Sequence, residues 1–555
     1  MKIILLLIAV MLLMVGAEAR YSPGLEIATG ENITLDGGFI KKIQTDGVFN
    51  ILAYGATPND FSDDAEAIQD CYDAAHLEFD RTGHFQVVNW PPGEFNGNTS
   101  QSVYTANNFT IISPRPGVIT QGSGMGATIF RAKDNFRDST HGVYLFRNDL
   151  EQIDHLTIRD ITFEYGNNTV EPGESNWTSI GAEYCSNVVI ENVEVLNVSG
   201  THGLQFGALE SAQNNTNAYV SNIHIYNAQG SSVVDDDTYD HTSVRFDMDN
   251  VIFRDSILEC ESKPDNAAGF EFHGNNSVAF NLKVINYTNG ANIGADQYPS
   301  NCTVTGQHIL FSLFTGVTNG VTLWSITADS MLSDVLLVGN KVVMDASGCG
   351  VVGISHTGGI RSVNCYDNDI SSTNSGVWTY GGLFEDIDNI NFQRNNVHNT
   401  TNGFYVLNTE YIETYDISDN NILHWGYGVT NGQHSAGLYI EIRPTVDGGH
   451  LVVNNNHMNG YGYPYYGIFT YCPNLMDISI RDNDILGCAA QDIVEAYTWR
   501  TDEDLYIEHS SHAYTPLSSS WAPVGAKDGS IWTYQGNGTL YRKDTTWKEV
   551  DWTYV

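Results

Sequence analysis

The chain has 555 residues, of which 66 are acidic and 25 are basic, so its formal net charge at pH 7 is -41. This charge argues against nucleic acid or an anionic membrane as a partner, because both would repel it. The 53 glycines, the 14 prolines and an aromatic share of 11% are typical of many short strands joined by tight turns.

The first segment, residues 1–19, has the features of a secretory signal peptide. Lys2 gives a short basic start, residues 3–16 form an apolar run, and residues 17–19 (Ala-Glu-Ala) form a small-x-small cleavage site. The run is short for a membrane span, so an uncleaved anchor is the weaker alternative. No later segment is apolar enough to cross a bilayer. We therefore expect a secreted or cell-surface protein with no membrane span after signal cleavage.

Residues 20–135 are expected to form an N-terminal segment, a cap and the first coils of a solenoid. They contain FNILAYGATPNDFSDDAEAIQDCYDAA from Phe49, VVNWPPGEFNG over residues 87–97 and GSGMGATIFRA over residues 122–132. Asp63 or Asp64 can cap a helix that would cover the open end of the first coil and block edge-to-edge aggregation. The apolar face of this helix would consist of Ala67, Ile68, Cys71 and Ala75.

These segments resemble the opening of the pectate-lyase-like superfamily, which includes polygalacturonase-like enzymes and viral tailspikes. In that superfamily a strand, a Tyr-Gly-Ala turn, an Asp-Asp helix start and a Pro-Pro-Gly strand cap a right-handed parallel β-helix. The resemblance implies this fold. It is much less specific for activity, since the superfamily contains hydrolases, lyases, epimerases and proteins with no known catalysis.

A phrase that recurs six times predicts that residues 136–500 form the solenoid. Each copy has two apolar residues two positions apart, an asparagine three positions later and an apolar residue two positions after that, which is the period of strands. Successive asparagines are 28, 27, 25, 36 and 27 residues apart, so each copy is one coil. We expect each asparagine to mark a turn and to bond the next in an interior ladder, about 4.8 Å away. The asparagines are Asn340, Asn368, Asn395, Asn420, Asn456 and Asn483.

Four upstream copies carry other residues in the asparagine position. They are Leu156, Ile158, Ile161, Phe163; Val188, Ile190, Val193, Val195; Val251, Phe253, Ser256, Leu258; and Val278, Phe280, Lys283, Ile285. The predicted fold class is therefore all-β, a right-handed parallel β-helix solenoid with an N-terminal cap of a strand plus a short helix.

Residues 501–555 are expected to form a small C-terminal β module. Residues 529–534, 538–541 and 547–550 alternate as short hairpins do and resemble the small modules that cap, trimerise or attach tail-fibre and surface proteins. Carbohydrate binding through Trp532, Trp547 or Trp552 is the weaker alternative, since tryptophans in so small a module are more often its core.

A second phrase, a glycine followed by an apolar residue, predicts an outward-facing strip on one side of the solenoid. If the residue after the glycine points inward, the next points outward. The outward residues are then Glu271, His273, Thr322, Trp324, Trp378, Tyr380, Tyr405, Tyr439, Glu441, Phe469 and Tyr471. Sugar rings pack their CH-rich faces on aromatic faces, so the strip predicts an oligosaccharide groove. Its substrate-binding residues would be Trp324, Trp378, Tyr380, Tyr405, Tyr439 and Glu441. A covered interface, either a homotrimer contact or a loop across the sheet, is the alternative.

Carboxylates at the N-terminal end of the strip predict catalytic acids. Asp235 and Asp236 precede Glu271 by one coil, and side chains of neighbouring coils can sit at the separations of about 5–9 Å that glycosidases use. We expect Glu271 with Asp235 or Asp236 to supply a general acid and a base or nucleophile. His202 or His273 would tune their protonation.

The acidic run also has two other interpretations, a solvated loop and a calcium site that includes Asp237 and Asp240. Lyases of the resembled superfamily can use calcium to acidify a uronic acid while an arginine or lysine takes the proton, and Arg245 and Arg254 are near in sequence.

The catalytic motifs of polygalacturonase-like enzymes occur in this sequence only as fragments. Residues 201–203 (Thr-His-Gly) match half of the histidine motif but precede the aspartates, and no Arg-Ile-Lys is present.

The eight cysteines are compatible with disulfides in an oxidising compartment, but Cys365 occupies an inward position where a packed free thiol fits equally well. Triplets that permit N-glycosylation begin at Asn32, Asn98, Asn108, Asn176, Asn197, Asn286 and Asn537.

The signal peptide, the repeat, the outward strip and the carboxylates together predict a secreted β-helix protein that binds and cleaves an extracellular polysaccharide, as a glycoside hydrolase or, less favourably, as a lyase. The alternative is a non-catalytic adhesive or spike-like surface protein that uses the same face for glycan attachment or oligomerisation.

Overall fold

The structure is a computed structural model. It describes residues 33–35, 38–40, 45–98, 102–105, 108–132, 142–148, 152–165, 178–198, 202–207, 215–228, 241–264, 267–295, 303–325, 330–355, 359–374, 378–408, 412–426, 435–443, 449–460, 466–472, 477–486, 491–495, 504–507, 518–519, 531–534, 540–544 and 546–549. The predicted signal peptide lies outside these ranges. The described part of the chain contains no helix with the length and hydropathy that a membrane span requires.

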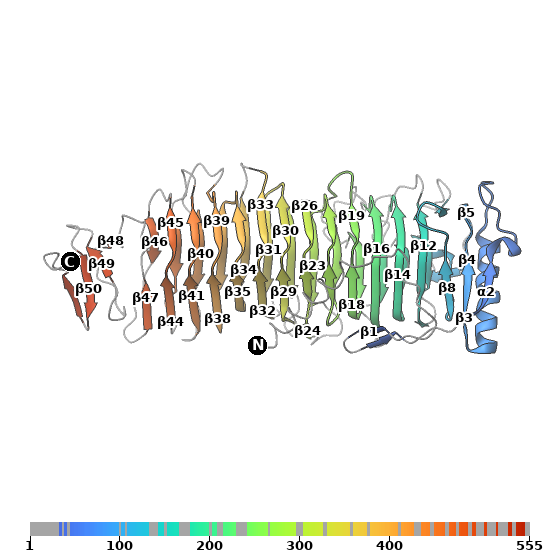
Figure 1. The fold of residues 1–555 in the computed structure, drawn as a ribbon, viewed down its shortest axis with the longest axis horizontal. Coiled ribbons are helices and arrows are strands. Elements are labelled where there is room, and N and C mark those ends of the chain that lie inside the picture. The colour runs from blue at the N-terminus through green and yellow to red at the C-terminus, as the bar shows by residue number, and fades with distance from the viewer. Residues whose placement is uncertain are drawn as a thin grey trace, which may run out of the picture. The chain divides into compact units, whose positions relative to one another are not determined.

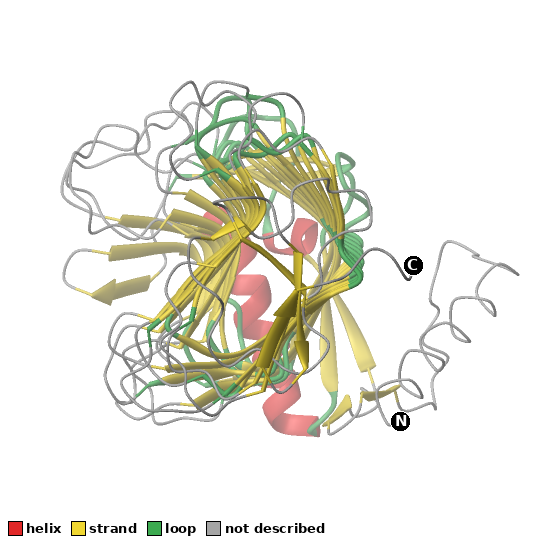
Figure 2. Ribbon diagram, turned by 90° about the vertical axis from the view of Figure 1, so that its left-hand side faces the viewer, coloured by secondary structure: helices red, strands yellow, loops and turns green. Residues whose placement is uncertain are grey.

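The chain divides into two compact units, residues 1–46 and residues 47–555. In the first unit, β1 (Ile33–Leu35) pairs antiparallel with β2 (Gly38–Ile40). The second unit contains the solenoid, in which strands of successive coils lie side by side along the chain (Figure 1) and over one another when viewed along the solenoid (Figure 2). It also contains a four-stranded sheet of β48 (Ser518–Ser519), β49 (Ile531–Tyr534), β50 (Leu540–Asp544) and β51 (Thr546–Glu549).

One side of the solenoid is a 15-stranded sheet that takes one strand from each coil, apart from the first two strands, which form a hairpin. Its strands are parallel except for the first pair, and each pairs with its neighbour on the next coil. In order they are β6 (Ser102–Thr105), β7 (Asn108–Ile112), β10 (Gly142–Asn148), β13 (Thr178–Ala182), β15 (His202–Gly207), β17 (His241–Asp247), β20 (Ala267–Phe272), β23 (Asn289–Ala295), β27 (Asn319–Ser325), β31 (Gly348–Ser355), β34 (Thr379–Glu385), β37 (Asn402–Asn408), β40 (Ala436–Ile442), β43 (Tyr466–Tyr471) and β46 (Gln491–Glu495).

The other sides form a continuous sheet of 30 strands, because most coils contribute two short strands that meet at a bend. These strands are β3 (Thr45–Asn50), β4 (Phe85–Asn89), β5 (Gly93–Gly97), β8 (Val118–Gln121), β9 (Thr128–Ala132), β11 (Ile153–Asp154), β12 (Thr157–Glu164), β14 (Cys185–Leu196), β16 (Thr216–Tyr226), β18 (Asp249–Arg254), β19 (Ile257–Glu259), β21 (Val278–Phe280), β22 (Lys283–Ile285), β24 (Thr303–Thr305), β25 (His308–Leu310), β26 (Leu313–Val317), β28 (Met331–Ser333), β29 (Val335–Val338), β30 (Lys341–Met344), β32 (Gly359–Tyr366), β33 (Asp369–Ser372), β35 (Ile387–Gln393), β36 (Asn396–His398), β38 (Thr414–Ser418), β39 (Asn421–Leu423), β41 (His450–Asn454), β42 (His457–Asn459), β44 (Asp477–Arg481), β45 (Asp484–Leu486) and β47 (Asp504–Ile507).

The predicted cap helix is α2 (Ala65–Thr82), which follows the short 3-10 helix η1 (Ile51–Tyr54) and lies against the first strands of the solenoid (Figure 1). Asp64 is its N-cap residue, and its carboxylate accepts hydrogen bonds from the backbone of Thr57 at 2.8 Å and of Asn96 at 3.0 Å. Of the predicted apolar face, Ile68, Cys71 and Ala75 are fully buried and Ala67 is partly buried. The helix therefore closes one end of the core, as predicted.

The predicted asparagine ladder is present in the interior. Each of the first five asparagines donates from its backbone N–H and from Nδ2 to Oδ1 of the next, at 2.9–3.1 Å. Each Nδ2 also donates to a backbone carbonyl of the preceding coil, so both amide groups are satisfied away from water. Further towards the N-terminus Ser312 takes the same position, since its N–H donates to Oδ1 of Asn340 at 3.0 Å.

Two details of the repeat differ from the prediction. The left-handed residue of each bend is the one before the ladder asparagine, such as Asp367 with φ 57° and Asp419 with φ 60°. The last upstream copy is also out of register by one residue. Leu258 pairs with Val284, so Leu282 takes the interior position and Lys283 is exposed. A shift of one residue exchanges the two faces of a strand.

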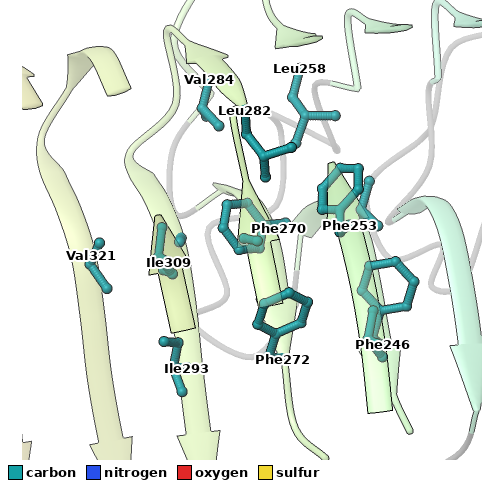
Figure 3. Close-up of a cluster of buried hydrophobic side chains, with 14 of the residues drawn as sticks. Phe246, Phe253, Leu258, Phe270, Phe272, Leu282, Val284, Ile293, Ile309 and Val321 are labelled. Carbon is teal, nitrogen blue, oxygen red and sulfur yellow. The ribbon is translucent and has the colours of Figure 1, made fainter. Parts of the chain in front are cut away.

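The core is a continuous cluster of aliphatic and aromatic side chains inside the coils. Figure 3 shows a part of it in which Phe246, Phe253, Phe270 and Phe272 pack together. All six cysteines in the described ranges are buried free thiols, so no disulfide forms among them. Cys365 occupies an interior position, as predicted, and burial raises its pKa.

The glycine of the second phrase marks the corner where several coils enter the 15-stranded sheet. On the coil of β34 the corner glycine is Gly381, whereas the phrase predicts Gly376, which lies outside the described residues. At Gly381 a Cβ atom would lie 2.2 Å from the carbonyl oxygen of Gly403 and 2.5 Å from a methyl group of Val397. Equivalent glycines recur on neighbouring coils with contacts as close. These are Gly269, Gly290, Gly320, Gly350, Gly403 and Gly437. The phrase thus reflects close approach between coils.

Gly381→Ala is expected to lower the free energy of unfolding by about 1–3 kcal/mol, because the added methyl group overpacks the corner. Thermal and denaturant unfolding of the purified variant would measure this loss. Gly359→Ala is the matched control, since the nearest atom to its Cβ would be 3.8 Å away in the Met331 side chain. Equal unfolding midpoints for the two variants would contradict the tight corner.

Candidate functional site

A column of polar side chains runs along the outward face of the 15-stranded sheet, from β10 to β27. The parallel register pairs its members from strand to strand. In chain order the column is Arg147, Gly181, Gln205, Arg245, Glu271, Asn292 and Thr322. The neighbours of Arg245 and Glu271 along their strands point into the core, including Phe246, Phe270 and Phe272 of Figure 3. The column therefore lies on the side of the sheet away from the core.

Glu271 uses both carboxylate oxygens in hydrogen bonds. Oε1 accepts from Nδ2 of Asn292 at 2.7 Å, and Oε2 lies 3.3 Å from Nε2 of His273. On the adjacent strand β17, Nε of Arg245 lies 3.1 and 3.2 Å from the two carboxylate oxygens of Asp247. Asp247 and His273 stand two residues beyond Arg245 and Glu271 and occupy the next outward column. The cluster thus joins two carboxylates, an arginine and a histidine on adjacent strands.

The two carboxylates have pKa values that shift in opposite directions. Burial raises the pKa of Asp247, and this effect outweighs the positive charge of Arg245. Burial also acts to raise the pKa of Glu271, but the hydrogen bond and charge of His273, the charge of Arg245 and the hydrogen bond from Asn292 together lower it to about 2. Glu271 is therefore ionised, while Asp247 keeps its proton to higher pH than an ordinary aspartate.

His273 and Trp324 form one wall of the cluster. Burial acts to lower the pKa of His273, but the hydrogen bond to Glu271 and the nearby carboxylates raise it overall, although Arg245 opposes them. The His273 ring meets the Trp324 indole edge to face, with centroids 5.9 Å apart. The indole lies over Gly294, where a Cβ atom would be only 2.7 Å from it. The missing side chain of Gly294 thus makes room for Trp324 beside His273.

The cluster is shielded from solvent. The exposed fractions are 6% for Arg245, 3% for Glu271 and 8% for His273. Burying charged groups is costly unless they are paired, and each of these side chains has the partners described above. A low local dielectric strengthens such contacts.

Three residues of the cluster and the column are not identified from the sequence. They are Asp247 in the cluster and Arg147 and Asn292 in the column. Arg147 lies at the N-terminal end of the column, where Nη1 donates to Oε1 of Gln205 at 3.0 Å and Nη2 lies 3.3 Å from Oε1 of Glu183. The alternation of Arg245, Phe246 and Asp247 is a signal of an outward-facing polar pair.

His202 lies at the start of β15 and is buried, and its Nδ1 lies 3.1 Å from the carbonyl oxygen of Thr242. The charges of Arg245 and Glu271 both act on this ring, so His202 lies near the cluster. Burial and the charge of Arg245 lower the pKa of His202 to about 3. Arg254 lies on β18 of the other sheet, where Nε donates to Asp255 at 2.5 Å.

The acidic run before β17 lies outside the described residues. Its members in the predicted acid pair and calcium site, which therefore stay predictions, are Asp235, Asp236, Asp237 and Asp240. Within the described ranges, no group of three or more His, Cys, Asp or Glu side chains could hold a metal ion.

The outward face continues towards the C-terminus as a stack of aromatic rings. Tyr405 and Tyr439 stack with centroids 4.6 Å apart and an interplanar angle of 6°, and Phe469 stacks on Tyr439 at 4.6 Å and 11°. Tyr380 meets Tyr405 edge to face at 5.5 Å. An aromatic strip is therefore present at these residues, but Leu383, and not the predicted Trp378, pairs with Tyr405, because Trp378 precedes β34. Because each ring covers the face of its neighbour, the strip presents ring edges and hydroxyl groups rather than open faces.

The remaining residues of the strip are arranged differently. Tyr439 donates from its hydroxyl to Oε2 of Glu441 at 2.8 Å, and Arg443 forms an ion pair with Glu441 and lies 5.0 Å from the centre of the Tyr471 ring. Trp378 is 42% exposed, which leaves part of its indole open to solvent. Glu441 is thus held by protein contacts, whereas Trp378 is partly exposed.

No family model matches the sequence, and no curated protein matches it. A mutant tailspike protein of E. coli bacteriophage HK620, solved in complex with a hexasaccharide, has a similar structure with a TM-score of 0.56 and 12% sequence identity, over 80% of this chain and 77% of that chain. The A-module of the mannuronan C-5 epimerase AlgE6 of Azotobacter vinelandii has a TM-score of 0.44 and 17% identity, over 81% of this chain and 99% of that chain. The chain therefore has the fold of a right-handed parallel β-helix.

Proposed function

We propose that this protein is secreted and hydrolyses an extracellular polysaccharide on the outward face of the 15-stranded sheet. Asp247 is the general acid, and Glu271 is the ionised partner that acts as base or nucleophile. The observation that carries the proposal is the placement of two buried carboxylates on adjacent strands of one face, Asp247 beside Arg245 and Glu271 between His273 and Asn292. The opposite directions of their pKa shifts agree with the two roles. Glycosidases need one protonated and one ionised carboxyl group beside the bond they cleave.

The spacing of the two residues fits this chemistry. Adjacent strands are about 4.8 Å apart and two residues span about 6.6 Å along a strand, so their Cα atoms are separated by about 8 Å. Flexible side chains can then hold the carboxyl groups within the range of about 5–9.5 Å that glycosidases use. Asn292 and His273 fix the orientation of Glu271.

Two further observations support a glycan as the ligand. The tailspike with the same fold was solved with a bound hexasaccharide. Trp324 lies near the carboxylates, and the partly exposed Trp378 lies directly before β34, further along the solenoid. Trp378 can pack against a sugar ring, and the hydroxyl groups of Tyr380 and Tyr405 can bond its hydroxyls.

A non-catalytic glycan-binding surface protein is the second candidate function. The observation that favours it is the burial of Glu271, Arg245 and His273, because buried ion clusters also occur as purely structural elements. In this case only the C-terminal half of the face would contact a glycan. Catalysis instead requires that a glycosidic bond reach side chains that solvent barely touches.

Incubation of the purified chain with a panel of neutral and acidic polysaccharides distinguishes the candidates. Dextran, galactomannan, xylan, alginate and polygalacturonate would form the first panel. A hydrolase releases reducing ends, whereas a lyase forms an unsaturated product that absorbs ultraviolet light. Retention of a polysaccharide without release of any product would contradict the hydrolase and support the binding protein.

The pH dependence of the hydrolysis provides a further prediction. The active form has Asp247 protonated and Glu271 ionised, so kcat/KM should rise as the pH increases through the lowered pKa of Glu271, about 2, and fall as it passes the raised pKa of Asp247. The optimum is therefore expected between the pKa values of the two groups. The pH profile of Asp247→Asn should lack the alkaline fall, because this variant has no proton to lose there. An unchanged profile would assign the general acid to another residue.

A further inference from the structure

Two polar atoms beside Glu271 have no hydrogen-bond partner within the described part of the chain. They are Oδ1 of Asn292 and Oγ1 of Thr322, and both are buried. The same register column contains Glu271, Asn292 and Thr322 on the adjacent strands β20, β23 and β27. The unpartnered atoms therefore follow the catalytic carboxylate along the outward face, towards the C-terminus.

The position of Asn292 is fixed by its other end. Because Nδ2 donates to Oε1 of Glu271 at 2.7 Å, Oδ1 is left as an acceptor that is not directed at this carboxylate. Thr322 supplies a hydroxyl group that can donate or accept. The indole of Trp324, which is two residues beyond Thr322, lies over Gly294, two residues beyond Asn292, and meets the His273 ring edge to face. An acceptor on the strand next to Glu271, a hydroxyl group one strand further along and an aromatic ring against His273 thus share this face.

Leaving these atoms unpaired has a cost in the free protein. A buried polar atom without a partner loses its hydrogen bonds to water and gains none in return. A valine at position 322 would have nearly the shape of threonine without this cost. A hydroxyl group that lowers stability on the outward face, beside a carboxylate with a strongly lowered pKa, fits a role in binding a ligand.

We propose that Asn292 and Thr322 form a recognition site for two hydroxyl groups on neighbouring carbons of the sugar residue next to the cleaved bond. This inference rests on the proposed function and names the feature of the substrate that the site recognises. One sugar hydroxyl donates to Oδ1 of Asn292, and the other exchanges a hydrogen bond with Oγ1 of Thr322. A sugar that lacks either hydroxyl leaves the protein atom unpaired and binds less well.

Thr322→Val tests the proposal in two independent measurements. The thermal unfolding midpoint of the free variant should be higher than that of the wild type, because an unpaired buried hydroxyl group is removed. Its kcat/KM on the panel polysaccharide that the wild type cleaves fastest should fall about 10- to 100-fold. Thr400→Val is the matched control, since Oγ1 of Thr400 is also buried and unpartnered but lies in the turn before β37, away from the column. It should gain stability and keep full activity.

The outcomes separate this inference from the proposed function. A Thr322→Val variant that is less stable than the wild type, or as active, overturns the recognition site even when the wild type hydrolyses the polysaccharide. If the wild type cleaves no member of the panel, the hydrolase proposal fails by itself. The recognition site is then judged from the rise in unfolding midpoint that the same polysaccharides cause. An equal rise in wild type and variant, or none in either, overturns it.

Discussion

Glu271→Gln is expected to lower kcat/KM on the cleaved polysaccharide by about 10²- to 10⁴-fold, the range for removing a catalytic acid or base. The glutamine keeps the shape of the side chain but cannot carry the negative charge that the low pKa of Glu271 maintains. Asn292 can still donate to the amide oxygen, so the local geometry should persist. Release of reducing ends measures the loss, and circular dichroism with thermal unfolding establishes that the variant is folded.

Glu259→Gln is the matched control for this variant. Glu259 is a glutamate on the 30-stranded sheet, where its Oε1 lies 3.1 Å from Nε2 of His224. The change removes the same charge from the chain but lies on another face of the solenoid, so activity should remain within about threefold of the wild type. A folded Glu271→Gln protein with full activity would remove Glu271 from the mechanism. Equal losses in both variants would point to the total charge rather than the site.

The solenoid could be predicted because its interior tolerates few alternatives. The side chain at position 420 must donate to a carbonyl on one side and to Asn456 on the other. This requirement restricts the position to asparagine, so the repeat can be recognised in the sequence. Where serine or an apolar residue replaces asparagine, this restriction is absent. The pattern at Val278 therefore predicts a register that is wrong by one residue. Phe280 has the hydrophobicity of a core residue, but it faces outward against Arg254 and Phe311.

The candidate site could be predicted only in part, because it depends on how strands from different coils align. The alternation after Gly269 identifies Glu271 and His273 as outward residues. The pairing of Glu271 with Arg245 and Asn292 depends on where β17 and β23 enter the sheet. The loops before these strands differ in length, so the sequence does not give these entry points. The alternation of inward and outward residues also does not predict how the aromatic rings of neighbouring strands are oriented. The stacking of Tyr405 on Tyr439 therefore emerged only from the structure.

Asn395→Ala is expected to lower the free energy of unfolding by about 3–5 kcal/mol, because each buried group that loses its partner costs about 1–3 kcal/mol. Asn395 is 1% exposed, and its side chain accepts from two N–H groups of Asn368 and donates to Asn420 and to the carbonyl oxygen of Cys365. Denaturant unfolding at pH 7 measures the loss. Asn396→Ala is the control, since Asn396 belongs to a partly buried outward row, where Nδ2 donates to Asp369 and Oδ1 accepts from Asn421, both at 2.8 Å, and water can replace the lost bonds. It should cost less than about 1 kcal/mol.

Asn395→Asp distinguishes hydrogen bonding from packing, because it keeps the shape of the side chain but replaces the donating amide with a second oxygen. At pH 7 this oxygen would face the acceptors on Asn420 and Cys365, so the variant should be at least as unstable as Asn395→Ala. Burial would raise the pKa of the new carboxyl group in the folded state above its unfolded value, so the folded state binds the proton more tightly. Stability should therefore increase as the pH falls through the raised pKa, since the protonated carboxyl group can donate again. A loss that is the same at pH 7 and pH 4, relative to the wild type at each pH, would mean that packing rather than the ladder holds these coils together.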